Sequence, residues 1–185
     1  MLYSHFKTVI IAFLFLGISS NSLFAGSWFA DSLFVEAETK RPELPQIKDI
    51  RDTARLSKTQ NLPILIMFGT DECPYCEMLR EEFLIPMIIS GDYTDKVILR
   101  EVHISDTASM IDFAGKKIRT RDFSRRYGVS LFPTTVLIDS KGNPLVKKII
   151  GITTPSLFGG TLDSRIDEAL KITRKSTSQL NSPSK

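Results

Sequence analysis

The feature that most constrains the fold is an uninterrupted apolar run, residues 62–69, which ends shortly before two closely spaced cysteines. A run of this length is too short for a helix and fits a strand buried on both faces. From Pro74 onward the apolar spacing becomes helical. The sequence therefore predicts a buried strand that leads directly into a helix, with Cys73 and Cys76 at the junction.

The rest of the chain alternates between helical and extended patterns. Helices are expected at residues 47–60, from residue 74 to about Pro86, around 119–128 and at 162–173; strands at 97–104, 134–139 and 145–150. Residues 105–118 are expected to form an insertion, a small hairpin, and residues 140–143 a hairpin turn. Pro86 should kink or end its helix, and Gly128 should cap the next one. This order implies an α/β domain with a central mixed sheet flanked by helices on both faces.

The N-terminal residues have the pattern of an export signal. Residues 1–25 combine a positive start at Lys7, an apolar middle and a small residue, Ala25, at the expected cut, although a retained anchor is the alternative. Residues 26–45 are interpreted as an arm or linker, residues 46–174 as one domain and residues 175–185 as a disordered tail. The expected location is periplasmic or otherwise extracytoplasmic, with contact to membrane only through the signal segment.

The charge pattern argues against nucleic acid as a partner. The formal net charge is only +3, and no basic run is interleaved with aromatic residues. The arginine-rich residues 119–126 are expected to be solvated surface, with steering of an acidic partner as the alternative.

The two cysteines are placed for chemistry more than for stability. A bridge between Cys73 and Cys76 closes almost no loop and so stabilises little. The start of a helix favours a thiolate at Cys73, and Pro74 suits the first helical position before Tyr75. Cys76 returns to the same face one turn deeper, at a separation that a disulfide accepts. We therefore expect thiol–disulfide exchange, with Cys73 attacking a partner disulfide and Cys76 resolving the mixed disulfide.

Other interpretations of the pair remain open from the residues alone. Two cysteines with this spacing are half of a zinc or copper site, to which His103 and a carboxylate could add ligands, as in a metal-binding chaperone. A structural bridge and a redox-inactive adaptor are further alternatives. The leading interpretation requires no cofactor and no metal ion.

Three segments resemble the thioredoxin family: residues 63–82, 127–134 and 139–143. The resemblance extends over residues 46–174 and is strongest to periplasmic SoxW-like thioredoxins, which share a Cys-Pro-Tyr-Cys centre. It implies a thioredoxin fold and a thiol:disulfide oxidoreductase that acts on protein disulfides as a reductant. It also implies a membrane thiol carrier as the source of electrons.

The resemblance assigns roles to two further residues and shows one departure. It implies that Pro133 is a cis-proline lying against the cysteine pair and that Phe132 docks the partner chain through its backbone. Thioredoxins place a buried acid where this chain has Met67. Proton transfer at Cys76 must then use another group or water. Asp71 and Glu72 are the nearby candidates, and the alternative is that both belong to a solvated loop.

Overall fold

The computed structural model of the chain describes residues 41–180. The predicted export signal at 1–25, most of the predicted arm and the last five residues lie outside the described residues. Within residues 41–180, no helix is both long enough and apolar enough to cross a membrane.

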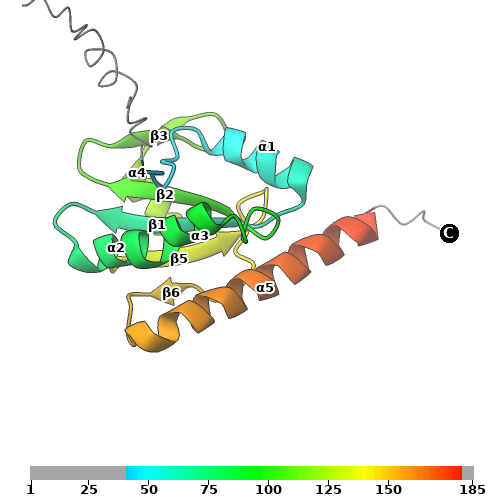
Figure 1. Cartoon of the computed structure of the whole chain (residues 1–185). Coiled ribbons are helices and arrows are strands. Elements are labelled where there is room, and N and C mark those ends of the chain that lie inside the picture. The colour runs from blue at the N-terminus through cyan, green and yellow to red at the C-terminus, as the bar shows by residue number, and fades with distance from the viewer. Residues whose placement is uncertain (1–40, 181–185) are drawn as a thin grey trace, which may run out of the picture. The chain divides into compact units, whose positions relative to one another are not determined.

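A four-stranded mixed sheet forms the centre of the domain, as predicted (Figure 1). The strands are β1 (Ile64–Thr70), β2 (Ile98–Ile104), β5 (Thr134–Ile138) and β6 (Ile149–Ile150), in the order β2-β1-β5-β6. β1 pairs in parallel with β2 and antiparallel with β5, so it has a neighbour on each side. The predicted insertion is a separate hairpin of β3 (Ser109–Ile111) and β4 (Lys117–Arg119).

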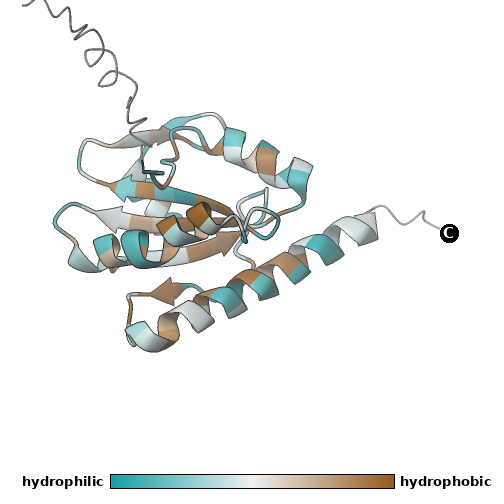
Figure 2. Ribbon diagram, viewed as in Figure 1, coloured by the Kyte–Doolittle hydropathy of each residue, from teal (hydrophilic) through white to brown (hydrophobic). Residues whose placement is uncertain are grey.

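Helices cover both faces of the sheet. They are α1 (Ile50–Gln60), α2 (Pro74–Leu79), the π-helical segment η1 (Arg80–Leu84), α3 (Ile85–Ser90), α4 (Thr120–Arg126) and α5 (Pro155–Leu180). Two core clusters result, because alternate residues of each strand face opposite sides. One cluster joins Leu65 and Met67 to α2, α3 and α5, and the other joins Ile66 and Phe68 to α1 and α4. Figure 2 shows the matching pattern on α5, where hydrophobic and hydrophilic residues alternate.

The first helix begins three residues later than predicted. The Ile47 N–H donates to the Glu101 carbonyl and the Glu101 N–H donates to the Pro45 carbonyl, each at 2.9 Å. Residues 45–47 therefore extend the sheet along the outer edge of β2. Asp49 then caps α1 by accepting a hydrogen bond from the Arg51 N–H.

Pro86 does not end its helix. The N–H of Ile85 bonds to the Arg80 carbonyl, five residues back, so the turn before the proline is π-helical. Pro86 then lies at the start of α3, where a missing N–H is tolerated. The left-handed conformation predicted for Gly128 is confirmed, with φ of +59°.

Two predictions near the C-terminus are wrong in extent. The strand predicted at 145–150 is only Ile149–Ile150, and where it is interrupted the Lys148 ammonium donates to the Tyr127 and Gly128 carbonyls. The last helix was predicted to end at residue 173 and be followed by a disordered tail, but α5 continues to Leu180. The Thr177 hydroxyl bonds to Asn61 beside α1, which ties this part of the helix to the domain.

The buried aromatic group around Phe68 should contribute strongly to stability. Phe68 is fully buried. The centroid of its ring lies 6.1 Å from that of Phe123 and 5.9 Å from that of Tyr127. Phe68→Ala should lower the free energy of unfolding by about 3 to 5 kcal/mol in urea titration, because it leaves a cavity. The control Ile89→Ala, at a side chain 62% exposed, should change it by less than about 0.5 kcal/mol. Equal losses in the two variants would contradict this packing.

Candidate active site

The junction between β1 and α2 brings the two cysteines to the first turn of a helix. Cys73 is the N-cap residue of α2, and its carbonyl accepts hydrogen bonds from the N–H groups of Cys76 and Glu77 at 3.0 and 3.1 Å. The Cys73 sulfur also accepts from the Cys76 N–H, with a separation of 3.2 Å. The Cys76 N–H in the first turn of the helix is therefore shared between the carbonyl and the sulfur of Cys73.

Cys73 and Cys76 form a disulfide, with their Cα atoms 5.2 Å apart. Cys73 is half-buried, whereas Cys76 is only 1% exposed and belongs to the core. Pro74 occupies the start of α2 as predicted, and the Tyr75 side chain beside it is 55% exposed. The pair therefore has one accessible and one sealed sulfur.

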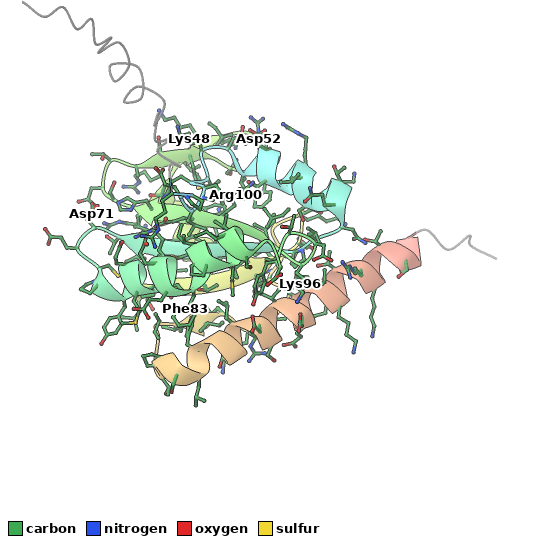
Figure 3. The ribbon with its side chains drawn as sticks, in the orientation of Figure 1. Lys48, Asp52, Asp71, Phe83, Lys96 and Arg100 are labelled. Carbon is green, nitrogen blue, oxygen red and sulfur yellow. A yellow bond between two sulfur atoms is a disulfide. The ribbon has the colours of Figure 1, made fainter. Side chains whose placement is uncertain are left out.

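An open pocket of about 550 Å³ adjoins the disulfide on the side of β2. The cysteines form part of its wall, and the charged or titratable side chains that line the rest are Asp71, Glu72, Glu77, Arg80 and His103. Figure 3 labels Asp71 on the loop after β1, at the same end of the sheet as α2. The space beside the sulfurs is thus polar on this side.

A buried ion pair lies beside this pocket. Arg80 donates to both carboxylate oxygens of Glu101, from Nη2 to Oε1 at 2.7 Å and from Nε to Oε2 at 3.2 Å. The Glu101 side chain is 2% exposed and that of Arg80 is 23% exposed, and Arg80 also pairs with the exposed Glu77. The hydrogen bond to Glu101 raises the pKa of the Arg80 guanidinium, so Arg80 is a permanent cation.

The two carboxylates that the sequence suggested as proton-transfer groups are not buried, in contrast to that of Glu101. Asp71 and Glu72 are both exposed, and the Asp71 carboxylate is 3.1 Å from the His103 Nε2. Met67 is fully buried and lies next to Glu101 in the parallel register of β1 and β2. Sequence reasoning missed Glu101 and Arg80, although alternation from Leu99 along the strand places Glu101 on the inner face.

The other side of the cysteine pair is apolar. Phe132 and Pro133 precede β5, whose first residue, Thr134, pairs with Phe68 near the end of β1. The Phe132–Pro133 bond is cis, as the resemblance implied. Phe132 is half-buried, Pro133 is buried and Leu131 before them is 62% exposed. Both predicted docking residues therefore lie at the end of the sheet that carries the cysteines.

The arginines of residues 119–126 are paired with carboxylates. The pairs are Arg119 and Arg125 with Asp122, Arg121 with Asp106, and Arg126 with Asp112, at 2.6 to 3.1 Å. This pairing cancels most of the local positive charge. Within residues 41–180, no group of three or more histidine, cysteine or acidic side chains is arranged to hold a metal ion.

Comparison with known proteins identifies a family that matches this chain. Residues 50–165 match the thioredoxin-like domain family. No curated protein matches the chain.

Similar solved structures include mitochondrial thioredoxin 3 from Saccharomyces cerevisiae, at 22% identity over 65% of this chain and 94% of that one, with a TM-score of 0.42. Thioredoxin f from spinach chloroplast has 14% identity over 66% and 94%, with a TM-score of 0.45. A thioredoxin-fold protein from Helicobacter pylori has 21% identity over 65% and 87%, with a TM-score of 0.40. The family match covers more than half of the sequence, and the chain belongs to the thioredoxin-like domain family.

Proposed function

We propose that the protein is a thiol:disulfide oxidoreductase that acts on protein disulfides through Cys73 and Cys76. The observation that carries the proposal is the asymmetry of the pair at the helix start. Cys73 is half-buried beside an open pocket, whereas Cys76, one turn deeper in the helix, is 1% exposed. A partner disulfide reaches only the outer sulfur, and the inner sulfur can attack only its neighbour.

The proposed reaction has two displacements. The Cys73 thiolate attacks one sulfur of the partner disulfide, forms a mixed disulfide and releases the other sulfur as a thiolate, which takes a proton from water. Cys76 then loses its proton and attacks the Cys73 sulfur, which forms the Cys73–Cys76 disulfide and releases the second partner thiol. The partner gains two electrons and the enzyme dithiol loses two. An N–H donor and the helix dipole at α2 stabilise the Cys73 thiolate.

Partner docking is proposed at the apolar side of the pair. No hydrogen bond joins the backbone of Phe132 to any other residue in the described part of the chain. Its amide and carbonyl are therefore open to an extended segment of a partner, in the manner of an added strand. Leu131, next to Phe132 in the chain, and Tyr75, between the two cysteines, have exposed side chains that supply apolar surface.

The proposed setting is extracytoplasmic, with the protein acting as a reductant that a membrane thiol carrier supplies with electrons. Residues 1–25 support export by their sequence pattern, and the Cys73-Pro74-Tyr75-Cys76 centre supports a SoxW-like subgroup. The direction of electron flow depends on the stability of the Cys73 thiolate relative to the disulfide.

The two sulfurs should differ sharply in reactivity. In the reduced protein, iodoacetamide at pH 7 should modify Cys73 at least about tenfold faster than Cys76, because only Cys73 is accessible and near a helix N-terminus. Peptide mass spectrometry at timed quenching measures both rates. In guanidinium chloride the rates should become equal, which serves as the control. Equal rates in the native protein would contradict the asymmetry.

Cysteine variants test the activity itself. Wild-type protein should accelerate reduction of insulin disulfides by dithiothreitol, followed by turbidity, whereas Cys73→Ser should leave only the uncatalysed rate. If Cys73→Ser reduces insulin at the wild-type rate, the proposed activity is refuted.

A second variant identifies the partners. Cys76→Ala should trap partners in cells as mixed disulfides at Cys73, because the resolving thiol is absent. Trapped partners that are all cytoplasmic would refute the setting, and tight retention of copper or zinc by the reduced protein would favour a metal chaperone.

The docking surface should discriminate between large and small disulfides. Leu131→Glu should raise the KM for insulin severalfold, because a charge replaces apolar contact area, and leave the rate with a small aromatic disulfide within about twofold. Ile89→Glu is the matched control, since Ile89 has the same 62% exposure on α3. If both variants behave alike, Leu131 has no part in docking.

A further inference from the structure

We propose that Glu101, held by Arg80, accepts the proton of Cys76 when Cys76 attacks the mixed disulfide. The inference rests on the proposed thiol exchange and adds the group that handles its second proton. The structure brings the Glu101 carboxylate and the Cys76 sulfur together around Gly69. A methyl group added at Gly69 would lie 3.3 Å from Glu101 Oε1 and 3.5 Å from Cys76 Sγ.

The sheet register explains how a residue of β2 comes to lie under α2. In the parallel ladder, Met67 pairs with Glu101 and Gly69 pairs with His103. Paired residues of neighbouring strands project from the same face, so Glu101 projects toward the helix that carries Cys76. Since Gly69 has no side chain, the carboxylate, the end of the Met67 side chain and the Cys76 sulfur all approach its α-carbon closely.

Solvent is excluded from the carboxylate on the other sides. Residues 45–47 cover the outer edge of β2 at Glu101 through two backbone hydrogen bonds. Met67 lies beside it and is fully buried, and a methyl group at Gly69 would also contact the Met67 side chain at 3.3 Å. A proton leaving the sealed Cys76 sulfur therefore has Glu101 as a nearby acceptor before it reaches bulk water.

Arg80 acts as a positioning residue. Its two hydrogen bonds hold both oxygens of Glu101 in one orientation. An ionised carboxylate has about four acceptor positions, so two hydrogen bonds leave capacity for a proton from Cys76. Arg80 lies four residues after Cys76 and therefore on the same side of the continuous α2–η1 helix.

The proton and electron balance of the step is complete. The Cys76 thiol gives its proton to the Glu101 carboxylate, and the Cys76 thiolate attacks the Cys73 sulfur. The Cys73–Cys76 bond forms, the bond from Cys73 to the partner sulfur breaks and the partner leaves as a thiolate. Glu101 then passes the proton to water or to that thiolate. In the reverse direction Glu101 returns the proton to Cys76.

The step can be isolated with 5,5′-dithiobis(2-nitrobenzoate), which releases one coloured thiolate when Cys73 attacks and a second when Cys76 resolves the adduct. The first release depends on reagent concentration and the second does not. Glu101→Gln should slow the second release at least about tenfold at pH 7 and leave the first within about twofold. In this variant the rate of the second release should rise about tenfold per pH unit, because the Cys76 proton must go directly to solvent.

A matched variant controls for loss of a buried ion pair. Asp112 is buried in the turn of the β3–β4 hairpin and accepts a hydrogen bond of 2.8 Å from Arg126 on α4. Asp112→Asn should leave both releases unchanged. Equal second-release rates and pH profiles in wild type and Glu101→Gln would overturn the proton relay alone, whereas absence of a second release in the wild type would overturn the thiol exchange as well.

A second substitution keeps the carboxylate and fills the gap. Gly69→Ala places a methyl group between the carboxylate and the sulfur, and it should slow the second release with little effect on the first. Gly160→Ala, where an added methyl group has no neighbour within 4 Å, should have no effect. If Glu101→Gln does not fold, as judged by circular dichroism, Gly69→Ala decides: a wild-type second release and pH profile would overturn the relay.

Discussion

Burial of β1 on both faces is the constraint on which the rest of the structure depends. Its residues from Ile64 to Phe68 have no exposed surface, and alternate side chains enter different core clusters. A shift of register by one residue would exchange the two faces, so the end of the strand is fixed relative to both layers. The three residues after Thr70 then allow little freedom in where α2 begins. The cysteine pair is therefore positioned by the core and not by its own loop.

The same arrangement gives the cysteine pair two unlike sides. β1 has β2 as its parallel neighbour and β5 as its antiparallel neighbour. The β2 side supplies Glu101, His103 and the charged pocket, whereas the β5 side supplies Phe132 and its cis-proline. In the proposed function, proton transfer and partner docking take place on opposite sides of one disulfide. A protein partner can cover the apolar side without displacing the charged groups.

The sequence predicted the parts of this fold that depend on local pattern. The buried strand, the helix start at Pro74, the hairpin insertion and the left-handed Gly128 all follow from spacing or from the conformational preference of single residues. The start of α1 and the length of α5 depend instead on distant partners. Ile47 is held by the Glu101 carbonyl and Thr177 by Asn61, and no local pattern contains these contacts.

The sequence did contain a signal for the buried ion pair. In the strand around residue 100, Leu99 and Glu101 share a face, while Val102 and Ile104 share the other. Apolar residues therefore lie on both faces of this strand. As long as the burial of the strand is unknown, a charged residue on either face is interpreted as exposed to solvent. The structure shows that the Leu99 face packs under α2 and α5. Burial of Glu101 follows from that packing, and Arg80 on η1 supplies its hydrogen-bonding partner.

A buried ion pair is weak support for stability, because apolar residues of similar volume often serve as well or better. Arg80 and Glu101 are therefore better explained by where they lie than by what they add to folding. The thioredoxin resemblance implies a buried acid on the central strand, where this chain has Met67. Here the buried carboxylate of Glu101 lies on the neighbouring strand, about 4.8 Å away, and Gly69 adds no side chain of its own between that carboxylate and Cys76. In the proposed relay Gly69 acts together with Glu101 and Arg80, since a methyl group at Gly69 would contact both the Glu101 carboxylate and the Cys76 sulfur.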